Sequence, residues 1–188
     1  DALKQVVKVP SLLYLLQILK DDDAEIRFIA VEALQGICQH ETCHFREQLL
    51  PEIAKLVNDP DMQVRRCAVE TLADIGGSET VELLVPLLND LHWQVRWAAA
   101  EALGKIGHQQ AVPHVMPLLK DSHGYVCRAA TAALGKIGGD EAVPLLIQGL
   151  RSGKRYVQKA ADDALPSIGA SHPVPFLLQS LKHEHDYI

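Results

Sequence analysis

The segment VRWAAAEALGKIG, residues Val95–Gly107, decides the fold because closely similar segments recur at a fixed interval. Four copies, 31 residues apart, begin at Val64, Val95, Val126 and Val157. An earlier copy begins at Ile26, so seven extra residues separate the first copy from the second. Periods of roughly 20–50 residues are typical of solenoids and other repeat folds. The sequence therefore predicts a chain of repeated structural units.

Each copy is predicted to form an amphipathic helix, which we call helix B. Three aliphatic positions recur at steps of four, four and three residues from the first residue of the copy, and such positions share one face of an α-helix. They hold Ala30, Ala68, Ala99, Ala130 and Ala161, then Leu34, Leu72, Leu103, Leu134 and Leu165, then Ile37, Ile75, Ile106, Ile137 and Ile168. We predict that this face is core. A glycine then ends helix B in four copies, at Gly76, Gly107, Gly138 and Gly169.

A second apolar segment precedes each helix B and is predicted to form helix A. Examples are AVPHVMPLLKD from Ala111 and AVPLLIQGL from Ala142. Prolines recur in register near its start, where the first helical turn tolerates them, at Pro51, Pro113, Pro144 and Pro175. Pro86 and Pro117 lie later in the segment, so those two helices A are expected to bend.

Two helices of about a dozen residues are too short to be stable alone, so neighbouring repeats must stack. The expected fold is an all-α solenoid forming a single domain, residues 1–188. Its parts are a partial repeat 1–9, repeats at about 10–38, 46–77, 79–107, 110–138 and 141–169, a partial repeat 172–188 and an insertion at about 39–45. Because the repeat continues past both ends, we expect a longer parent chain, or native ends covered by a dimer partner.

The pattern D-x4-V-R-x2-A-x3-L-x2-I-G at this period resembles the short HEAT repeats of the phycobilisome-lyase type. The resemblance covers nearly the whole chain and implies a solenoid whose helices B line the concave side. The members of this family include scaffolds, bilin lyase subunits and a di-iron hydroxylase. The hydroxylase carries His-Glu pairs on helix B, whereas this chain has Phe28-Ile29, Arg66-Cys67, Trp97-Ala98, Arg128-Ala129 and Lys159-Ala160 there. Di-iron chemistry is excluded by these residue types.

Composition excludes several further classes of protein. The 188 residues are 48% hydrophobic and 22% charged, with a net charge of −6, which argues against disorder and against nucleic acid as the partner. A membrane-spanning helix needs roughly 20 apolar residues, and no such run is present. Four cysteines without a signal peptide favour a cytoplasmic protein with reduced thiols. No catalytic motif is recognised, so neither an enzyme nor a cofactor is expected.

The candidate binding residues lie two positions after the first residue of each helix B. We call this set the helix B column: Phe28, Arg66, Trp97, Arg128 and Lys159. The position is about 200° around the helix from the first core residue, so it should face solvent. A basic and aromatic column on an acidic protein suits an acidic or amphipathic partner segment. Glu70 and Glu101 lie near the column and are counted with the candidate binding residues. The structural alternative for them, and for Glu32, is pairing with the cations of the column across neighbouring helices.

A second set of residues is expected to be structural. Arg27, Arg65 and Arg96 each follow a turn aspartate by six residues, an arrangement that in the resembling family forms a ladder of interhelical hydrogen bonds. The ladder residues are Asp59, Arg65, Asp90, Arg96 and Asp121, together with Arg27 and Asp21. The pattern lapses later, where Cys127 and Gln158 replace arginine. Those repeats are expected to be looser, or to use Arg128 and Lys159 in another way.

The insertion carries four metal-ligand residue types, Cys38, His40, Cys43 and His44, within seven residues. Their C-x-H-x2-C-H spacing matches no standard zinc site, and two adjacent ligands make tetrahedral coordination awkward. We therefore expect no metal here, and consider a polar loop or a partner contact instead.

These observations favour a scaffold or adaptor that binds an extended or helical segment of another protein on its concave face. The alternative is a subunit resembling the bilin lyases, in which the basic residues hold the propionates of an open-chain tetrapyrrole and Trp97 stacks on it. A third possibility is an adaptor or sensor segment of a larger protein.

Overall fold

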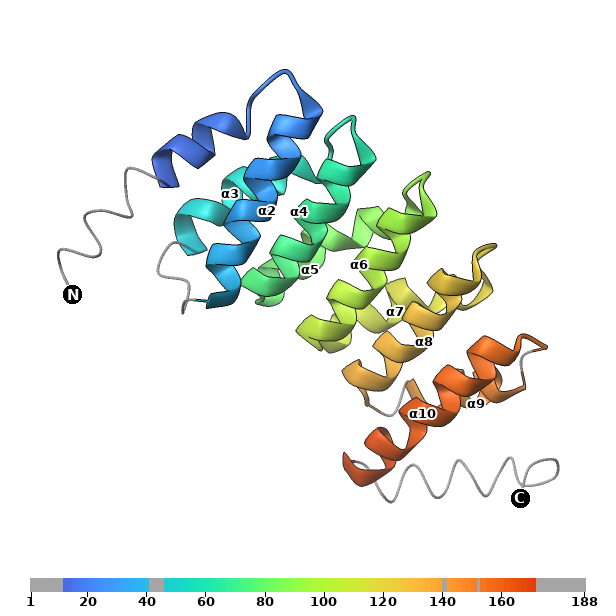
Figure 1. Ribbon diagram of the computed structural model, residues 1–188. Helices are drawn as coiled ribbons and strands as arrows, with labels where there is room; N and C mark the ends of the chain where they lie inside the picture. Colours follow the sequence, from blue (N-terminus) through green and yellow to red (C-terminus); the bar gives the residue numbers. More distant parts are fainter. Residues whose placement is uncertain (1–11, 41–45, 140–141, 152, 172–188) are drawn as a thin grey trace. The chain divides into compact units, whose positions relative to one another are not determined.

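The computed structural model describes residues 12–40, 46–139, 142–151 and 153–171, and every regular element in these ranges is a helix (Figure 1). Contacts divide the chain into two compact units, Asp1–Leu83 and Leu84–Ile188. In each unit, helices pack as antiparallel pairs against the next pair along the chain. The predicted fold class, an all-α solenoid, is therefore confirmed, whereas the expectation of a single domain stays a prediction.

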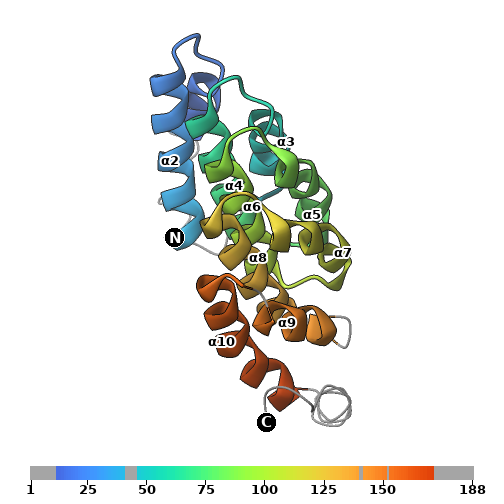
Figure 2. The same cartoon turned by 90° about the vertical axis from the view of Figure 1, so that its right-hand side faces the viewer.

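Unit 1 contains a helical segment at residues 12–18 and four further helices. These are α2 (Ala24–His40), α3 (Arg46–Leu56), α4 (Met62–Ile75) and α5 (Ser78–Leu84), of which the last residue of α5 belongs to unit 2. The helices B are α2 and α4. They pack against each other, and α3 packs against α4 from the other layer (Figure 2).

Unit 2 repeats the same two-layer arrangement three times. Its elements are η1 (Val85–Asn89), α6 (Trp93–Ile106), η2 (Gln109–Ala111), α7 (Val112–Val115), η3 (Met116–Lys120), α8 (Gly124–Ile137), α9 (Ala142–Leu150) and α10 (Arg155–Ser171). Helix α8 packs between α6 and α10, so these three helices B form one row. Elements η1, α7, η3 and α9 form the second layer, which Figure 2 shows on the other side of this unit.

The predicted core face of helix B is the core of both units. Val64, Ala68 and Leu72 are fully buried in α4, and the equivalent residues of α6 and α8 are fully buried as well. Ile26 departs from the pattern because it is 40% exposed.

Three of the four predicted glycine stops end their helices. Gly76, Gly107 and Gly138 have φ angles of 71°, 73° and 70°, in the region that favours glycine. The amide of Gly107 closes its helix by donating to the carbonyl of Leu103. The prediction for Gly169 is wrong, because α10 continues to Ser171. Ala170, the residue type with the highest helix propensity, follows that glycine and lets the helix extend.

The prolines of helix A act in two ways. Pro113 and Pro144 lie in the first turns of α7 and α9, as predicted. Pro51 does not, because α3 begins five residues earlier, at Arg46, and holds Pro51 in its interior. Where a bend was expected at Pro86 and Pro117, the helix changes from α to 3₁₀ at the residue before the proline. A proline lacks the N–H that an α-helix needs at this position. Pro175 lies outside the described residues.

Candidate functional site

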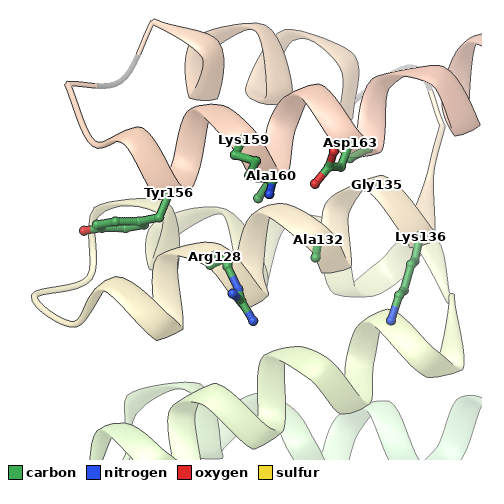
Figure 3. A pocket seen from close by; sticks show the side chains of 9 residues that line it. Arg128, Ala132, Gly135, Lys136, Tyr156, Lys159, Ala160 and Asp163 are labelled. Atoms are coloured by element: carbon green, nitrogen blue, oxygen red, sulfur yellow. The ribbon is translucent and has the colours of Figure 1, made fainter.

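Two residues of the helix B column, Arg128 and Lys159, border the same hollow in unit 2. Arg128 lies on α8 and Lys159 on the neighbouring α10, and both side chains are exposed. The hollow between them has a volume of about 480 Å³ (Figure 3). We call it the α8–α10 hollow. Its lining is Arg128, Ala132, Gly135, Lys136, Tyr156, Lys159, Ala160, Asp163 and Ala164.

Small residues form the floor of the α8–α10 hollow. Gly135 faces Ala164 so closely that a Cβ atom on Gly135 would lie 2.3 Å from the Cβ of Ala164. The two helices therefore approach each other where neither carries a large side chain. Ala132 and Ala160 continue this floor toward the N-terminal ends of the helices, and they leave the space between the longer side chains of the rim unfilled.

The rim of the hollow is predominantly cationic. Arg128 and Lys136 extend from α8 and Lys159 from α10, whereas Asp163 is the single carboxylate of the lining (Figure 3). Within the described ranges none of these three cations forms an ion pair. Their charges are therefore available to a ligand on a protein whose net charge is −6.

The third column residue of unit 2, Trp97, lies on α6 and is partly buried. Other aromatic rings lie near it, at the N-terminal ends of the helices B. The ring of Trp93 stacks on His123 at 4.9 Å and on Tyr125 at 5.5 Å between centroids, with interplanar angles of 22° and 21°. Tyr125 is 60% exposed and Tyr156, which lines the hollow, is 39% exposed. Sequence reasoning missed this aromatic edge.

In unit 1 the column consists of Phe28 on α2 and Arg66 on α4, and both are partly buried. Arg66 donates from Nη1 to Glu70 Oε1 at 2.6 Å, within the same helix. The cross-helix pairing expected for Glu70 is therefore wrong: residues four apart on a helix are neighbours, so the two side chains meet without a second helix. Glu32 and Glu101 are exposed, and neither forms an ion pair in the part of the chain that the structure describes.

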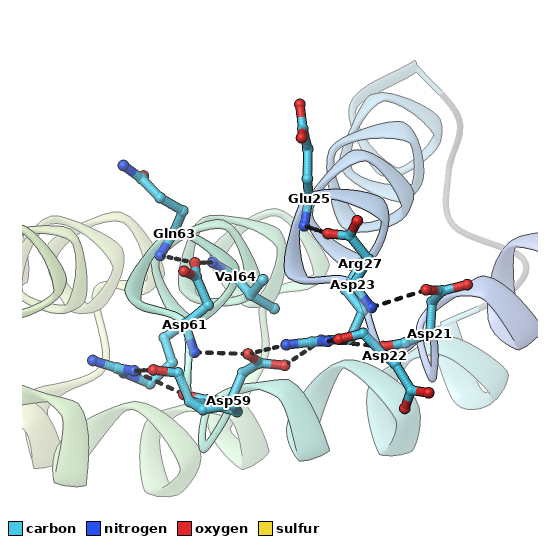
Figure 4. Close-up of polar contacts among 11 residues, drawn as sticks. Asp21, Asp22, Asp23, Glu25, Arg27, Asp59, Asp61, Gln63 and Val64 are labelled. Carbon is cyan, nitrogen blue, oxygen red and sulfur yellow. Dashed lines mark hydrogen bonds and ion pairs between the residues drawn. The ribbon is translucent and has the colours of Figure 1, made fainter.

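Ladder residues make polar contacts between consecutive repeats within each unit. In unit 1, Arg27 donates to both carboxylate oxygens of Asp59 at 2.8 Å, and to the carbonyls of Asp21 and Asp22 at 2.8 and 3.0 Å (Figure 4). These hydrogen bonds to Asp59 raise the pKa of Arg27. Arg65 donates to the carbonyls of Asp59 and Pro60.

Unit 2 contains the equivalent contact. Arg96 donates to Asp121 at 2.8 and 3.1 Å and to the carbonyl of Asp90 at 2.8 Å. Burial raises the pKa of Asp121, but the hydrogen bonds from Arg96 and from the amide of His123 outweigh it, so the net pKa is lowered.

Comparison with known proteins now identifies the repeat. The sequence profile of the HEAT repeats matches residues 12–91, 50–134, 81–166 and 117–188. The chain belongs to the HEAT-repeat family. The resemblance predicted from the 31-residue pattern is thereby confirmed. None of the curated protein sequences matches the chain.

Solved structures share this HEAT-repeat architecture. The CpcE–CpcF complex of phycocyanin lyase from Nostoc sp. PCC7120 has a TM-score of 0.70 at 23% identity, over 93% of this chain and 70% of that one. An engineered protein has a TM-score of 0.65 at 26% identity, over 90% and 83%. A designed armadillo repeat protein in complex with the peptide (KR)4 has 0.64 at 23%, over 88% and 84%. At 23% identity, the likeness to the phycocyanin lyase complex and to the armadillo design shows a shared fold and nothing about function.

The ladder of this HEAT-repeat chain changes its chemistry at α8. Cys127 replaces the arginine and donates from Sγ to the carbonyl of Asp121 at 3.1 Å. Lys154, immediately before α10, donates to the same carbonyl at 3.1 Å and to Cys127 Sγ at 3.6 Å. Lys154 therefore makes the ladder contact here, whereas Arg128 and Lys159, for which another use was expected, line the hollow. Lys154 aligns with Asp61, His92 and His123 of earlier repeats. A lysine at this position, in the repeat that follows the loss of the ladder arginine, is the sequence signal that could have predicted its contact with Asp121.

The thiols of the described HEAT repeats are structural. Cys38, Cys67 and Cys127 are buried, and burial raises the pKa of Cys67 to about 12. The Cys43 and His44 of the insertion, and the side chain of His40, lie outside the described residues. Among the residues that the structure describes, no three His, Cys, Asp or Glu side chains gather as a metal site would require. None of the described helices combines the length and apolar character needed to cross a membrane.

Proposed function

We propose that this HEAT-repeat chain is a protein-binding scaffold that holds an extended or helical segment of another protein against its helices B. The observation that carries the proposal is the α8–α10 hollow. Its floor consists of small residues, and its rim carries three cations, two of which belong to the helix B column. None of the three cations has an acidic partner within the described ranges. Clustered arginine and aromatic residues are the side chains most enriched in binding hot spots.

The remaining column residues extend this proposed surface within each unit. Trp97 lies on α6, beside α8, together with the aromatic edge formed by Trp93, Tyr125 and Tyr156. Phe28 and Arg66 occupy the same register on the packed pair α2 and α4 of unit 1. The engagement of Arg66 by Glu70 makes it a weaker anchor than Arg128, because a partner must first displace that carboxylate.

A selection experiment tests the proposed function without assuming a partner. A displayed library of random dodecapeptides is panned against the chain, and the selected peptides are titrated against the double variant Trp97→Ala, Arg128→Glu. We expect their affinity to fall by at least about tenfold, as is usual when two interface anchors are removed. The control is Lys120→Glu, which makes the same charge change on η3, in the layer of the helices A. Peptides that bind the double variant as tightly as the parent chain would contradict the proposal.

A bilin-binding subunit is the second candidate. Its support is the fold likeness to the phycocyanin lyase complex together with a hollow bordered by three cations, which suit carboxylates such as propionates. Addition of a bilin should then shift and sharpen its visible absorption, and Arg128→Glu should remove the change. An absorption spectrum identical to that of the free pigment rejects this candidate and leaves the scaffold proposal intact.

A further inference from the structure

We propose that the α8–α10 hollow binds an acidic segment of a partner protein, which places one aliphatic side chain on the alanine floor and directs carboxylates to the surrounding cations. The inference rests on the proposed scaffold function and adds the chemistry of the partner.

The first argument is the division of the lining into an apolar floor and a charged rim. Ala132, Gly135, Ala160 and Ala164 offer no hydrogen-bonding side chain, so a polar group placed on them would lose its water without gaining a partner. An aliphatic side chain gains free energy from the same burial. The volume of about 480 Å³ lies within the range of roughly 300–1,000 Å³ typical of ligand pockets.

The second argument is charge complementarity. Arg128, Lys136 and Lys159 line the hollow together with a single carboxylate, Asp163 (Figure 3). A basic segment would meet three like charges, whereas an acidic segment would meet three opposite ones. The protein carries a net charge of −6, so this cationic patch differs in sign from the molecule as a whole. A local reversal of sign orients an acidic partner toward this face.

The third argument comes from a second hollow of unit 2, on the opposite layer. That hollow has about 780 Å³ and is lined by η3, α9 and the start of α10, with Lys120 and Arg151 as its cations. Arg151 is already engaged by another group. The larger hollow therefore lacks the set of free cations that distinguishes the α8–α10 hollow, and it carries no residue of the helix B column.

Three labelled dodecapeptides of one length test the inference by fluorescence anisotropy. The first repeats Leu-Glu-Glu, the second Leu-Lys-Lys and the third Ala-Glu-Glu. We expect the first to bind, the second to bind at least about tenfold more weakly because of its charge, and the third about tenfold more weakly because its anchor is too small. Raising the salt concentration should weaken the first complex, since rim charges are screened.

Two variants locate the complex. Ala132→Leu is expected to fill the floor and to weaken the first peptide at least about tenfold, and circular dichroism checks that this variant is folded. Lys136→Glu changes an exposed rim residue and should weaken binding about three- to fivefold. Lys120→Glu, on the opposite layer, should leave it unchanged. Equal binding of the Leu-Glu-Glu and Leu-Lys-Lys peptides, or indifference to both hollow variants, overturns the inference.

The outcome separates the two proposals. If the acidic peptide fails but library-selected peptides still lose affinity in the Trp97→Ala, Arg128→Glu variant, only the partner chemistry is wrong. If the selected peptides are also indifferent to that variant, the scaffold proposal is wrong as well.

Discussion

Arg27 and Asp59 form a bidentate ion pair that joins two consecutive repeats of unit 1, with Nε–Oδ2 and Nη2–Oδ1 distances of 2.8 Å. Both side chains are nearly inaccessible, with exposed fractions of 11% and 5%. Arg27 also satisfies the carbonyls of Asp21 and Asp22, so one guanidinium ties helix α2 to the turn before it and to the turn of the following repeat (Figure 4).

Replacement of this arginine should be strongly destabilising. Arg27→Ala leaves a buried carboxylate without its cation, which typically costs about 3–5 kcal/mol of unfolding free energy. Urea denaturation measures the change. The control is Glu79→Gln, because Glu79 pairs with Arg46 in a contact whose side chains are 50% and 38% exposed, and such exposed pairs contribute little to stability. If both variants lost a similar amount of unfolding free energy, the burial of the Arg27–Asp59 pair would not explain its contribution to stability.

The stabilising contribution of Asp121 should be lost in acid, so the protein should become less stable as the pH falls. Its pKa is lowered in the folded chain, so its contribution is present above its ordinary value of 3.8 and is lost as the pH falls through the folded value. The urea midpoint should therefore decline between about pH 5 and pH 2, and Asp121→Asn should reduce this decline because it removes the titrating carboxyl. Glu101→Gln, which removes an exposed carboxyl on the neighbouring α6, serves as the control. A decline that Asp121→Asn leaves untouched contradicts the prediction.

The sequence predicts most of the fold because each structural position occurs in several copies, so a pattern that is ambiguous in one copy is supported by the others. The same core position holds valine in four copies, and Val64, Val95 and Val126 are all fully buried. Where one copy departs from the pattern, the prediction fails. Gly169 does not end its helix, and Pro51 lies in the interior of α3, because Ala170 and the residues before Pro51 favour a longer helix than the shared pattern.

The candidate site is only half visible in the sequence. Arg128 and Lys159 share one register on adjacent helices, so their approach to a common hollow follows from the repeat. The stacked rings of Trp93, His123 and Tyr125 hold three different registers, so no column of the sequence alignment brings them together. The depth of the hollow likewise depends on how closely α8 and α10 pack, which periodicity alone does not give.

The close approach of α8 and α10 predicts opposite effects of one substitution at two glycines. Gly135→Ala would bring its Cβ within 2.3 Å of Ala164 Cβ, and such overpacking typically costs about 1–3 kcal/mol. Gly36→Ala, inside α2, meets no atom within 4 Å, so it should gain about 0.5–1 kcal/mol from helix propensity. Thermal and urea unfolding of the two variants test this contrast. A Gly135→Ala variant as stable as Gly36→Ala would mean that the helices separate at no cost.

Lys154 and Lys159 lie five residues apart on either side of the α10 N-terminus, yet they should affect different properties. Lys154 donates to the carbonyl of Asp121, so Lys154→Met should lower the unfolding free energy while peptide affinity stays unchanged. Lys159 is exposed at the rim of the hollow, so Lys159→Met should leave stability within about 0.5 kcal/mol and weaken the Leu-Glu-Glu peptide. Urea denaturation and anisotropy on the same two samples separate the effects. If Lys154→Met weakened the peptide as much as Lys159→Met does, the ladder and the binding surface could not be treated as separate parts of the molecule.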